Sequence, residues 1–211
     1  MKRTRVLLAD DHPLTLEGLR TFLAPHLESV GTVMDGRALV EAALRLKPDL
    51  IILDITMPLL NGIDAAIQIR KALPSVKLLF VTMHVNPAYL EAALNAGGTG
   101  YVLKSAAREE LLEAIQSVID GRIYLTPSLS TESLGRFTDP SRAAAALRLS
   151  MREREVLQLI AEGMAAKEIA SVLTISVKTV EFHRENIKRK LGLRSTAELT
   201  KHAIEEGLVS F

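Results

Sequence analysis

The stretch 49-DLIILD-54 decides the first fold assignment, because four aliphatic residues in a row end at a single carboxylate, Asp54. A strand that is apolar at every position is typical of a parallel sheet with helices on both faces. Asp54 then lies at the carboxyl end of a buried strand. Strands often end in polar residues, so Asp54 by itself does not indicate a functional site. The residues at the ends of the other strands decide whether it belongs to one.

Strand-like and helix-like patterns alternate along the first 120 residues. Strand-like runs at 4–9, 29–34, 49–54, 76–82 and 100–103 are followed by helix-like segments at 13–23, 38–46, 62–72, 87–95 and 108–119. Pro and Gly mark many of the borders. Five such pairs predict an α/β fold, a doubly wound parallel sheet covered by helices on both faces. Sheets of this kind bind ligands at the carboxyl ends of their strands.

The rest of the chain has a different pattern. Residues 121–149 contain Pro127, Pro140, several Ser and Thr and an alanine run, which predict a linker with a short helix near Ala143. Helix patterns follow at 151–162, 165–173, 177–191 and 196–206, and Ser150 with Glu153 has the spacing of a capping box. We expect an α/β domain at 1–121, a linker at 122–147 and an all-α domain of four helices at 148–211.

Composition narrows the function classes. The chain has no cysteine, which excludes a disulfide scaffold, a cysteine nucleophile and cysteine-based metal sites. Its longest apolar runs are far below the ~18 residues that span a membrane, and its N-terminus lacks the apolar run of a secretion signal. We therefore expect a cytoplasmic protein with no membrane partner.

Polar side chains stand at the ends of four predicted strands: Asp10 and Asp11, Asp54, Thr82 and Lys104. In a parallel sheet these ends share one edge, so three carboxylates, a hydroxyl and an ammonium should converge there. Clustered carboxylates repel one another, and Mg²⁺ is the cation that suits such oxygen ligands. Asp11 and Asp54 would hold it, with Asp10 in an outer position. Asp54 is then placed as a nucleophile toward a phosphoryl group, and Thr82 and Lys104 as partners of the phosphoryl oxygens.

These motifs resemble the receiver domain of two-component response regulators over nearly all of residues 4–120. The matching pieces are 7-LLADDHP-13, 50-LIILDITMP-58, 78-LLFVTMH-84 and 100-GYVLK-104. The resemblance implies these roles: Asp54 as phosphoacceptor, Asp10 and Asp11 as the acidic pair, Thr82 and Lys104 as switch hydroxyl and phosphate-binding lysine, the backbone carbonyl of Thr56 as a further metal ligand, and Tyr101 as the switching aromatic residue.

Two residues depart from the common receiver pattern. Ser105 stands where many receivers have proline after the lysine. Met83 stands where many have a small residue after the switch threonine, and we hypothesise that its bulk slows the entry of a phosphodonor or water.

The predicted helix at 177–191 carries an apolar stripe, Val180, Ile187 and Leu191, that must pack on the other helices. Residues 176–194 hold six basic and two acidic side chains, a local basic patch that points to nucleic acid. A cationic helix on a helical scaffold is the element that enters a major groove, although an ordinary solvated helix face has the same pattern. Glu185 cannot face phosphate favourably, so it would either accept from cytosine N4 or pair with Arg189 four residues on, and of the two we expect the pair.

This tail resembles the LuxR-type helix-turn-helix over residues 149–195, with 152-REREVL-157, 167-KEIA-170 and 177-VKTVEFHRENIKRKL-191 as matching pieces. The resemblance implies that 177–191 is the recognition helix and that 196–206 is a dimer helix. The expected DNA-binding residues are Lys178, Thr179, Glu181, Phe182, Glu185, Asn186, Lys188, Arg189 and Lys190. A receiver joined to this tail is the NarL/FixJ type of response regulator.

The sequence thus predicts a transcriptional regulator that accepts a phosphoryl group on Asp54 from a histidine kinase, dimerises with a second copy and binds double-stranded promoter DNA. We expect no enzyme activity beyond slow loss of its own phosphate. A haloacid-dehalogenase-like phosphatase would need an acid where Thr56 stands. A receiver whose helical tail binds protein instead of DNA is the alternative, and a weak dependence of binding on salt would favour it.

Overall fold

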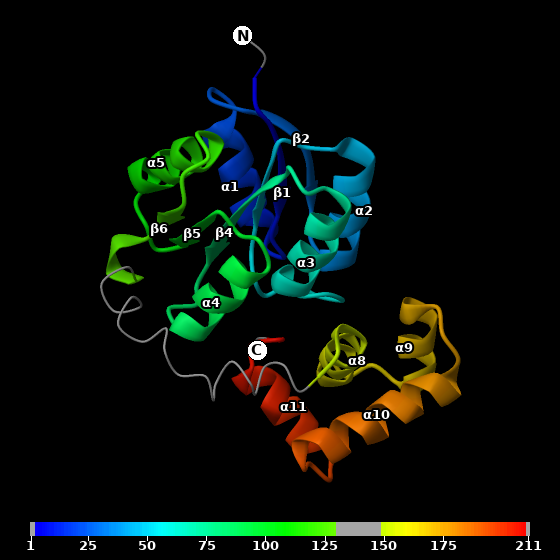
Figure 1. The fold of residues 1–211 in the computed structure, drawn as a ribbon. Helices are drawn as coiled ribbons and strands as arrows, with labels where there is room; N and C mark the ends of the chain where they lie inside the picture. Colours follow the sequence, from blue (N-terminus) through cyan, green and yellow to red (C-terminus); the bar gives the residue numbers. More distant parts are fainter. Residues whose placement is uncertain (1–2, 130–148, 210–211) are drawn as a thin grey trace. The chain divides into compact units, whose positions relative to one another are not determined.

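The computed structural model describes residues 3–129 and 149–209, which form two compact units, one built around a sheet and one made of helices. Figure 1 shows the helices and strands of both units. Within those two ranges, no helix has the length and apolar character that a membrane crossing requires. The predicted short helix near Ala143 and most of the predicted linker lie outside the described residues.

The first unit is an α/β fold with a wholly parallel sheet in the order β2-β1-β3-β4-β5-β6 (Figure 1). Its strands are β1 Arg5–Ala9, β2 Glu28–Val33, β3 Leu50–Leu53, β4 Lys77–Thr82, β5 Gly100–Leu103 and β6 Tyr124–Leu125. Its helices are α1 Pro13–Leu23, α2 Gly36–Leu46, α3 Gly62–Ala72, α4 Pro87–Asn95 and α5 Arg108–Ile119. All five predicted strand–helix pairs are present, which confirms the predicted fold class.

The sequence does not predict β6, because Tyr124 and Leu125 fall within the predicted linker. The strand has only two residues and pairs with β5, Gly100 opposite Tyr124. Two residues are too few to show an alternating pattern. The sheet therefore extends a few residues beyond the predicted domain end at 121.

Helices cover both faces of the sheet, as Figure 1 shows. Apolar residues of α1 and α5 pack on the face that presents Val6, Leu8, Leu50 and Ile52, and α2, α3 and α4 lie side by side in that order in the other layer. β3 is buried along its whole length, as its sequence predicts. After β3 the chain turns back so tightly that a Cβ atom on Gly62 would lie 1.9 Å from the backbone oxygen of Asp54. Glycine at 62 thus permits the close packing that fixes the backbone of Asp54.

The second unit contains α8 Met151–Ala161, α9 Ala166–Leu173, α10 Val177–Leu191 and α11 Thr196–Glu205. The predicted capping box is present: the Ser150 side chain accepts from the N–H of Glu153, and the Glu153 carboxylate accepts from the N–H of Ser150. Ser176 caps α10 as predicted. Buried residues from all four helices, among them Val156, Ile169, Val180 and Leu199, form one core. The predicted all-α domain is confirmed.

Candidate functional site

Three of the predicted site residues meet at the carboxyl edge of the parallel sheet. The Lys104 Nζ donates to Asp10 Oδ2 and to Asp54 Oδ2, each at 2.7 Å. Both carboxylates are buried, and the Lys104 side chain is only 13% exposed. β1, β3 and β5 are parallel, so the residues that follow them are brought to one edge although Asp54 and Lys104 are 50 residues apart in the chain and Asp10 is further still from Lys104. The predicted convergence is confirmed for these three side chains.

The ion pairs keep Lys104 charged. Burial alone would lower the pKa of Lys104, but its hydrogen bonds to Asp10 and Asp54 outweigh burial and raise that pKa. The ammonium thus lies between two carboxylates and offsets the repulsion that they would otherwise exert on each other. Asp54 also accepts a 2.6 Å hydrogen bond at Oδ1 from the N–H of Ile55, which orients its carboxylate.

Asp11 lies beside this cluster and has a different partner. Its Oδ1 lies 2.6 Å from His12 Nδ1, and the same ring nitrogen lies 3.3 Å from Asp10 Oδ1. The N–H of His12 also donates to Asp10 Oδ1. Asp10, Asp11 and His12 have ligand atoms within 4.8 Å of one another. His12 was not among the predicted site residues, although its position directly after the acidic pair was a signal for it.

The donor set fits Mg²⁺. One cation, the Lys104 ammonium, already bonds carboxylate oxygens of both Asp10 and Asp54, so these oxygens converge on a common point. Asp11 adds a third carboxylate next to Asp10. Hard oxygen ligands of this kind are those that Mg²⁺ prefers, with waters and substrate oxygens completing its shell.

Thr82 and Tyr101, the two predicted switch residues, are both fully buried. The Thr82 Oγ1 accepts a long hydrogen bond of 3.4 Å from the N–H of His84. The Tyr101 hydroxyl donates to the backbone oxygen of His84 at 2.8 Å. Burial, followed by the negative charge of Asp54, raises the pKa of Tyr101, so its hydroxyl stays protonated and able to donate.

His84, which bonds both Thr82 and Tyr101, also contacts Thr56 through its side chain. The His84 Nε2 lies 2.7 Å from the Thr56 Oγ1, and the His84 ring stacks on Tyr89 with ring centroids 4.1 Å apart. Burial lowers the pKa of His84, and the Asp54 charge opposes that shift. The sequence reasoning assigned Thr56 only a backbone role and gave His84 none. A side-chain bond between residues 28 positions apart leaves no periodic signal in a sequence.

In the helical unit, α10 presents the predicted DNA-binding residues, several of them exposed. Lys178, Phe182, Glu185, Arg189 and Lys190 are exposed, and Thr179, Glu181, Asn186 and Lys188 are partly buried. Phe182 is an unusual aromatic side chain on this surface, with 63% of it exposed. Val180 and Ile187, on the predicted packing face, are buried. The division of α10 into a packing face and an exposed face is confirmed.

The predicted pair between Glu185 and Arg189 is wrong. Glu185 Oε1 accepts from Lys188 Nζ at 3.0 Å instead, and Arg189 donates to the Asn186 side chain at 2.8 Å. Both interactions join residues three apart, which are also neighbours on a helix surface. Lys188 has a long flexible chain and reaches the carboxylate from that position.

Lys190 has a partner in the scaffold. Its Nζ bonds Glu153 Oε2 at 2.6 Å and so joins α10 to the capping box of α8. Burial alone would raise the pKa of Glu153, but hydrogen bonds from Lys190 and Ser150 outweigh burial and lower it. A DNA contact of Lys190 stays a prediction, whereas its contact with α8 is a feature of the fold.

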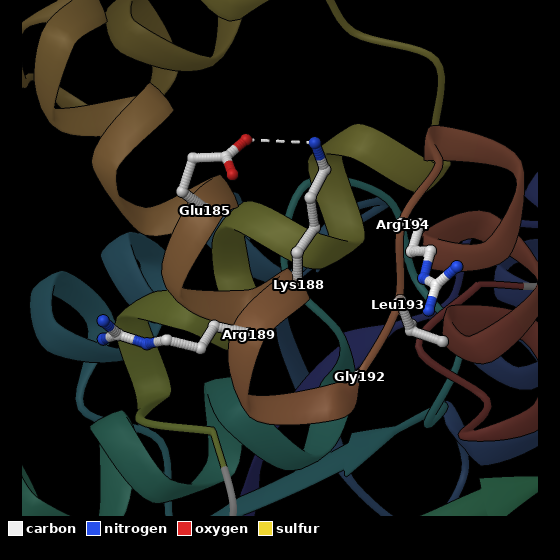
Figure 2. Close-up of a pocket in the computed structure, with 6 residues that line it drawn as sticks. All are labelled: Glu185, Lys188, Arg189, Gly192, Leu193 and Arg194. Carbon is white, nitrogen blue, oxygen red and sulfur yellow. Dashed lines mark hydrogen bonds and ion pairs between the residues drawn. The ribbon is translucent and has the colours of Figure 1, made fainter.

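The carboxyl end of α10 forms a shallow hollow, which Figure 2 shows. Glu185, Lys188, Arg189, Gly192, Leu193 and Arg194 line it. Three of these six side chains are cationic and one is acidic, so the surface suits an anionic partner such as a nucleic-acid backbone. Arg194 was not among the predicted DNA-binding residues, since it follows the helix; only the count of basic residues over 176–194 pointed to it.

Residues 6–116 match the family described as response regulator receiver domain, and residues 147–203 match the family described as bacterial regulatory proteins, luxR family. The chain belongs to the LuxR-type response regulators. It is a transcriptional regulator with a receiver domain followed by a LuxR-type helix-turn-helix domain, as the resemblance predicted.

This response regulator is similar to curated relatives along nearly its whole length. It is 36% identical to the transcriptional regulatory protein MctR of Rhizobium johnstonii, over 99% of this chain and 96% of MctR. It is 37% identical to the oxygen regulatory protein NreC of Staphylococcus aureus, over 98% of this chain and 100% of NreC. Among solved structures, it resembles RcsB of Salmonella enterica serovar Typhimurium bound to promoter rprA with the phosphomimetic BeF3−. The TM-score is 0.56 and the identity 33%, over 93% of this chain and 96% of RcsB.

Proposed function

We propose that a histidine kinase transfers a phosphoryl group to Asp54 of this response regulator, and that the modified receiver promotes binding of α10 to promoter DNA. The observation that carries the proposal is the Asp10–Lys104–Asp54 cluster at the carboxyl edge of the sheet. In it a carboxylate nucleophile lies next to a cation and to further acids, and phosphoryl transfer to a carboxylate needs this kind of charge neutralisation.

In the transfer, an Asp54 carboxylate oxygen attacks the phosphorus, the bond from phosphorus to the kinase imidazole nitrogen breaks, and that nitrogen keeps the electron pair. Lys104 exchanges its bond to Asp54 for one to a phosphoryl oxygen while it keeps its bond to Asp10. The Thr82 hydroxyl, which accepts from the N–H of His84, donates its own hydrogen to another phosphoryl oxygen. Tyr101 moves with the same loop, to which its hydroxyl is bonded.

Asp10, Asp11, Asp54 and the backbone carbonyl of Thr56 are the residues that would hold Mg²⁺. When bound, the ion would neutralise negative charge on the carboxylates and the phosphoryl oxygens. Lys104, which follows β5, supplies a second positive charge at the same edge of the sheet. No enzyme activity toward other substrates follows from this arrangement; slow hydrolysis of the protein's own aspartyl phosphate is the expected chemistry.

For the output, exposed Lys178, Arg189 and Arg194 would contact DNA phosphates, and Phe182 would contact an apolar base edge such as a thymine methyl group. The similarity to RcsB, which has been solved bound to a promoter, supports DNA as the partner. Activation would pair two copies as a homodimer, so that two recognition helices meet two half-sites. A regulator of promoter DNA would act in the cytoplasm, and we propose that location for this protein.

The first test is the intact mass of the full chain after incubation with Mg²⁺ and acetyl phosphate. We expect one added phosphoryl group on the wild type and none on Asp54→Asn. The second test measures binding to promoter DNA over a range of salt. We expect the apparent affinity to fall steeply with salt and to rise on phosphorylation of the wild type only. Binding with little salt dependence would instead favour a protein-binding output.

A further inference from the structure

His84 contacts four residues that belong to four separate parts of the receiver. Its backbone N–H reaches Thr82 at the end of β4, and its backbone oxygen accepts from Tyr101 of β5. Its ring nitrogen lies 2.7 Å from the Thr56 hydroxyl, in the loop after β3, and its ring stacks on Tyr89 of α4. The backbone of His84 therefore bonds the two switch residues, and its ring contacts the loop after β3 and helix α4.

We propose that the His84 ring is a brace that fixes the position of the loop between β4 and α4. Thr56 and Tyr89 hold the ring, and the ring holds the peptide on which both Thr82 and Tyr101 depend. His84 is thus a positioning residue for the phosphoryl transfer, and Thr56 acts in it through its side-chain hydroxyl. The inference rests on the proposed function for its kinetic consequence, but the brace itself is a property of the unphosphorylated receiver.

The consequence follows from the shared peptide. The Thr82 hydroxyl accepts from the His84 N–H and the Tyr101 hydroxyl donates to the His84 oxygen, so a shift of either side chain toward or away from Asp54 moves the His84 peptide or stretches these bonds. A ring held on two sides resists that movement. Loss of one neutral hydrogen bond shifts an equilibrium between two conformations by about 2- to 10-fold. Without the Thr56 bond, the loop should open more often and the phosphorylated arrangement should form faster.

Thr56→Val and Thr56→Ser are a matched pair for the test. Valine has nearly the shape of threonine without its hydroxyl, serine keeps a hydroxyl, and both keep the backbone carbonyl. We would measure amide hydrogen exchange of residues 83–90 in the unphosphorylated full chain, with residues 13–23 of α1 as a check on the fold. We expect Thr56→Val to exchange about 2- to 10-fold faster than wild type at 83–90 only, and Thr56→Ser to rescue most of the difference.

The second readout is the rate of phosphorylation by acetyl phosphate with Mg²⁺, followed by intact mass. We expect Thr56→Val to be phosphorylated faster than wild type by about the same factor, and Thr56→Ser to be closer to wild type. His84→Ala removes both ring contacts, so the change caused by Thr56→Val should be small in a His84→Ala background. A purely additive pair would show that the two side chains do not act together.

The brace is overturned if Thr56→Val and Thr56→Ser exchange alike at 83–90, or if Thr56→Val is phosphorylated at the wild-type rate or more slowly. If the proposed function is wrong, the phosphorylation measurement gives a different result from the one that overturns the brace. In that case wild-type Asp54 accepts no phosphoryl group, and the exchange comparison, which requires no phosphate, alone decides for or against the brace.

Discussion

Two lysines in this protein each bond a buried carboxylate, one in each unit. Lys104 bonds both Asp10 and Asp54, which follow two other strands, and its side chain is 13% exposed. Lys190 bonds only Glu153, and its side chain is 39% exposed. The chemistry of the two ion pairs is the same, but Lys104 joins three separate strand ends whereas Lys190 fastens one helix to another.

The difference lies in what else each carboxylate binds. Glu153 Oε2 already accepts from the N–H and the hydroxyl of Ser150 as well as from Lys190, so its role in the capping box is fixed. Asp54 Oδ2 is bonded to Lys104, which has a second carboxylate to hold it when Asp54 is modified. Lys104, which is shared between two carboxylates, can therefore exchange one partner for another. Lys190, which bonds the carboxylate of a helix cap, stabilises the fold.

The largest effect that would test this comparison is on phosphorylation. Lys104→Ala removes the cation that would neutralise phosphoryl oxygens, and loss of one such group costs about 10²- to 10³-fold in rate. We expect the rate of phosphorylation by acetyl phosphate, measured by intact mass, to fall by that factor. Lys201→Ala, which removes an exposed lysine of α11, is the control. Equal rates in both variants would show that Lys104 takes no part in the transfer.

Glu153→Gln should have the next largest effect, on the stability of the helical unit. It removes the charge that pairs with Lys190 and weakens the capping box, and we expect the free energy of unfolding to fall by about 2 kcal/mol. Chemical denaturation of the full chain, followed by circular dichroism, would measure the change in the transition of that unit. Glu205→Gln, which breaks an exposed pair with Lys201, should cost about 0.5 kcal/mol or less.

The same carboxylate predicts a pH dependence. The pKa of Glu153 is lowered in the fold from its usual value near 4.5, so its stabilising effect is fully present above that value. The effect is lost as the pH falls through the lowered pKa, where the folded protein also takes up the proton. The difference in unfolding free energy between wild type and Glu153→Gln should therefore shrink below pH 4.5. A constant difference down to acid pH would contradict the ion pair.

Substitutions of Lys190 and Lys178 should affect DNA binding differently, because Lys190 already bonds Glu153. Lys178 is exposed, and its side chain forms no hydrogen bond or ion pair with the part of the chain that the structure describes. We expect Lys178→Ala to weaken DNA binding and to reduce the slope of log affinity against log salt by about 1. Fluorescence anisotropy over a salt series would measure this slope. Lys190→Ala should change it less; an equal change would mean that Lys190 leaves Glu153 when DNA binds.

How far the sequence predicts such features depends on whether they follow from regular structure. Asp10, Asp54 and Lys104 were placed together correctly because parallel strands bring their carboxyl ends to one edge, whatever the loops between them. The capping box of Ser150 was correct because it is local. The bond between Thr56 and His84, and that between Lys190 and Glu153, depend on side-chain directions in loops and between helices. Neither leaves a periodic pattern, so only the structure supplies them.

Met83→Ala should have the smallest effect of these substitutions. The sequence does not show in which direction the Met83 side chain points. The bulk of Met83 was expected to hinder entry of a phosphodonor or water, but 68% of its side chain is exposed. A substitution of an exposed side chain usually changes a free energy by about 0.5 kcal/mol or less, which is about twofold in a lifetime. We therefore expect the lifetime of the Asp54 phosphate, followed by intact mass after removal of acetyl phosphate, to shorten by about twofold at most. A much shorter lifetime would show that Met83 covers the phosphorylated site and that its exposure in the unphosphorylated receiver does not persist.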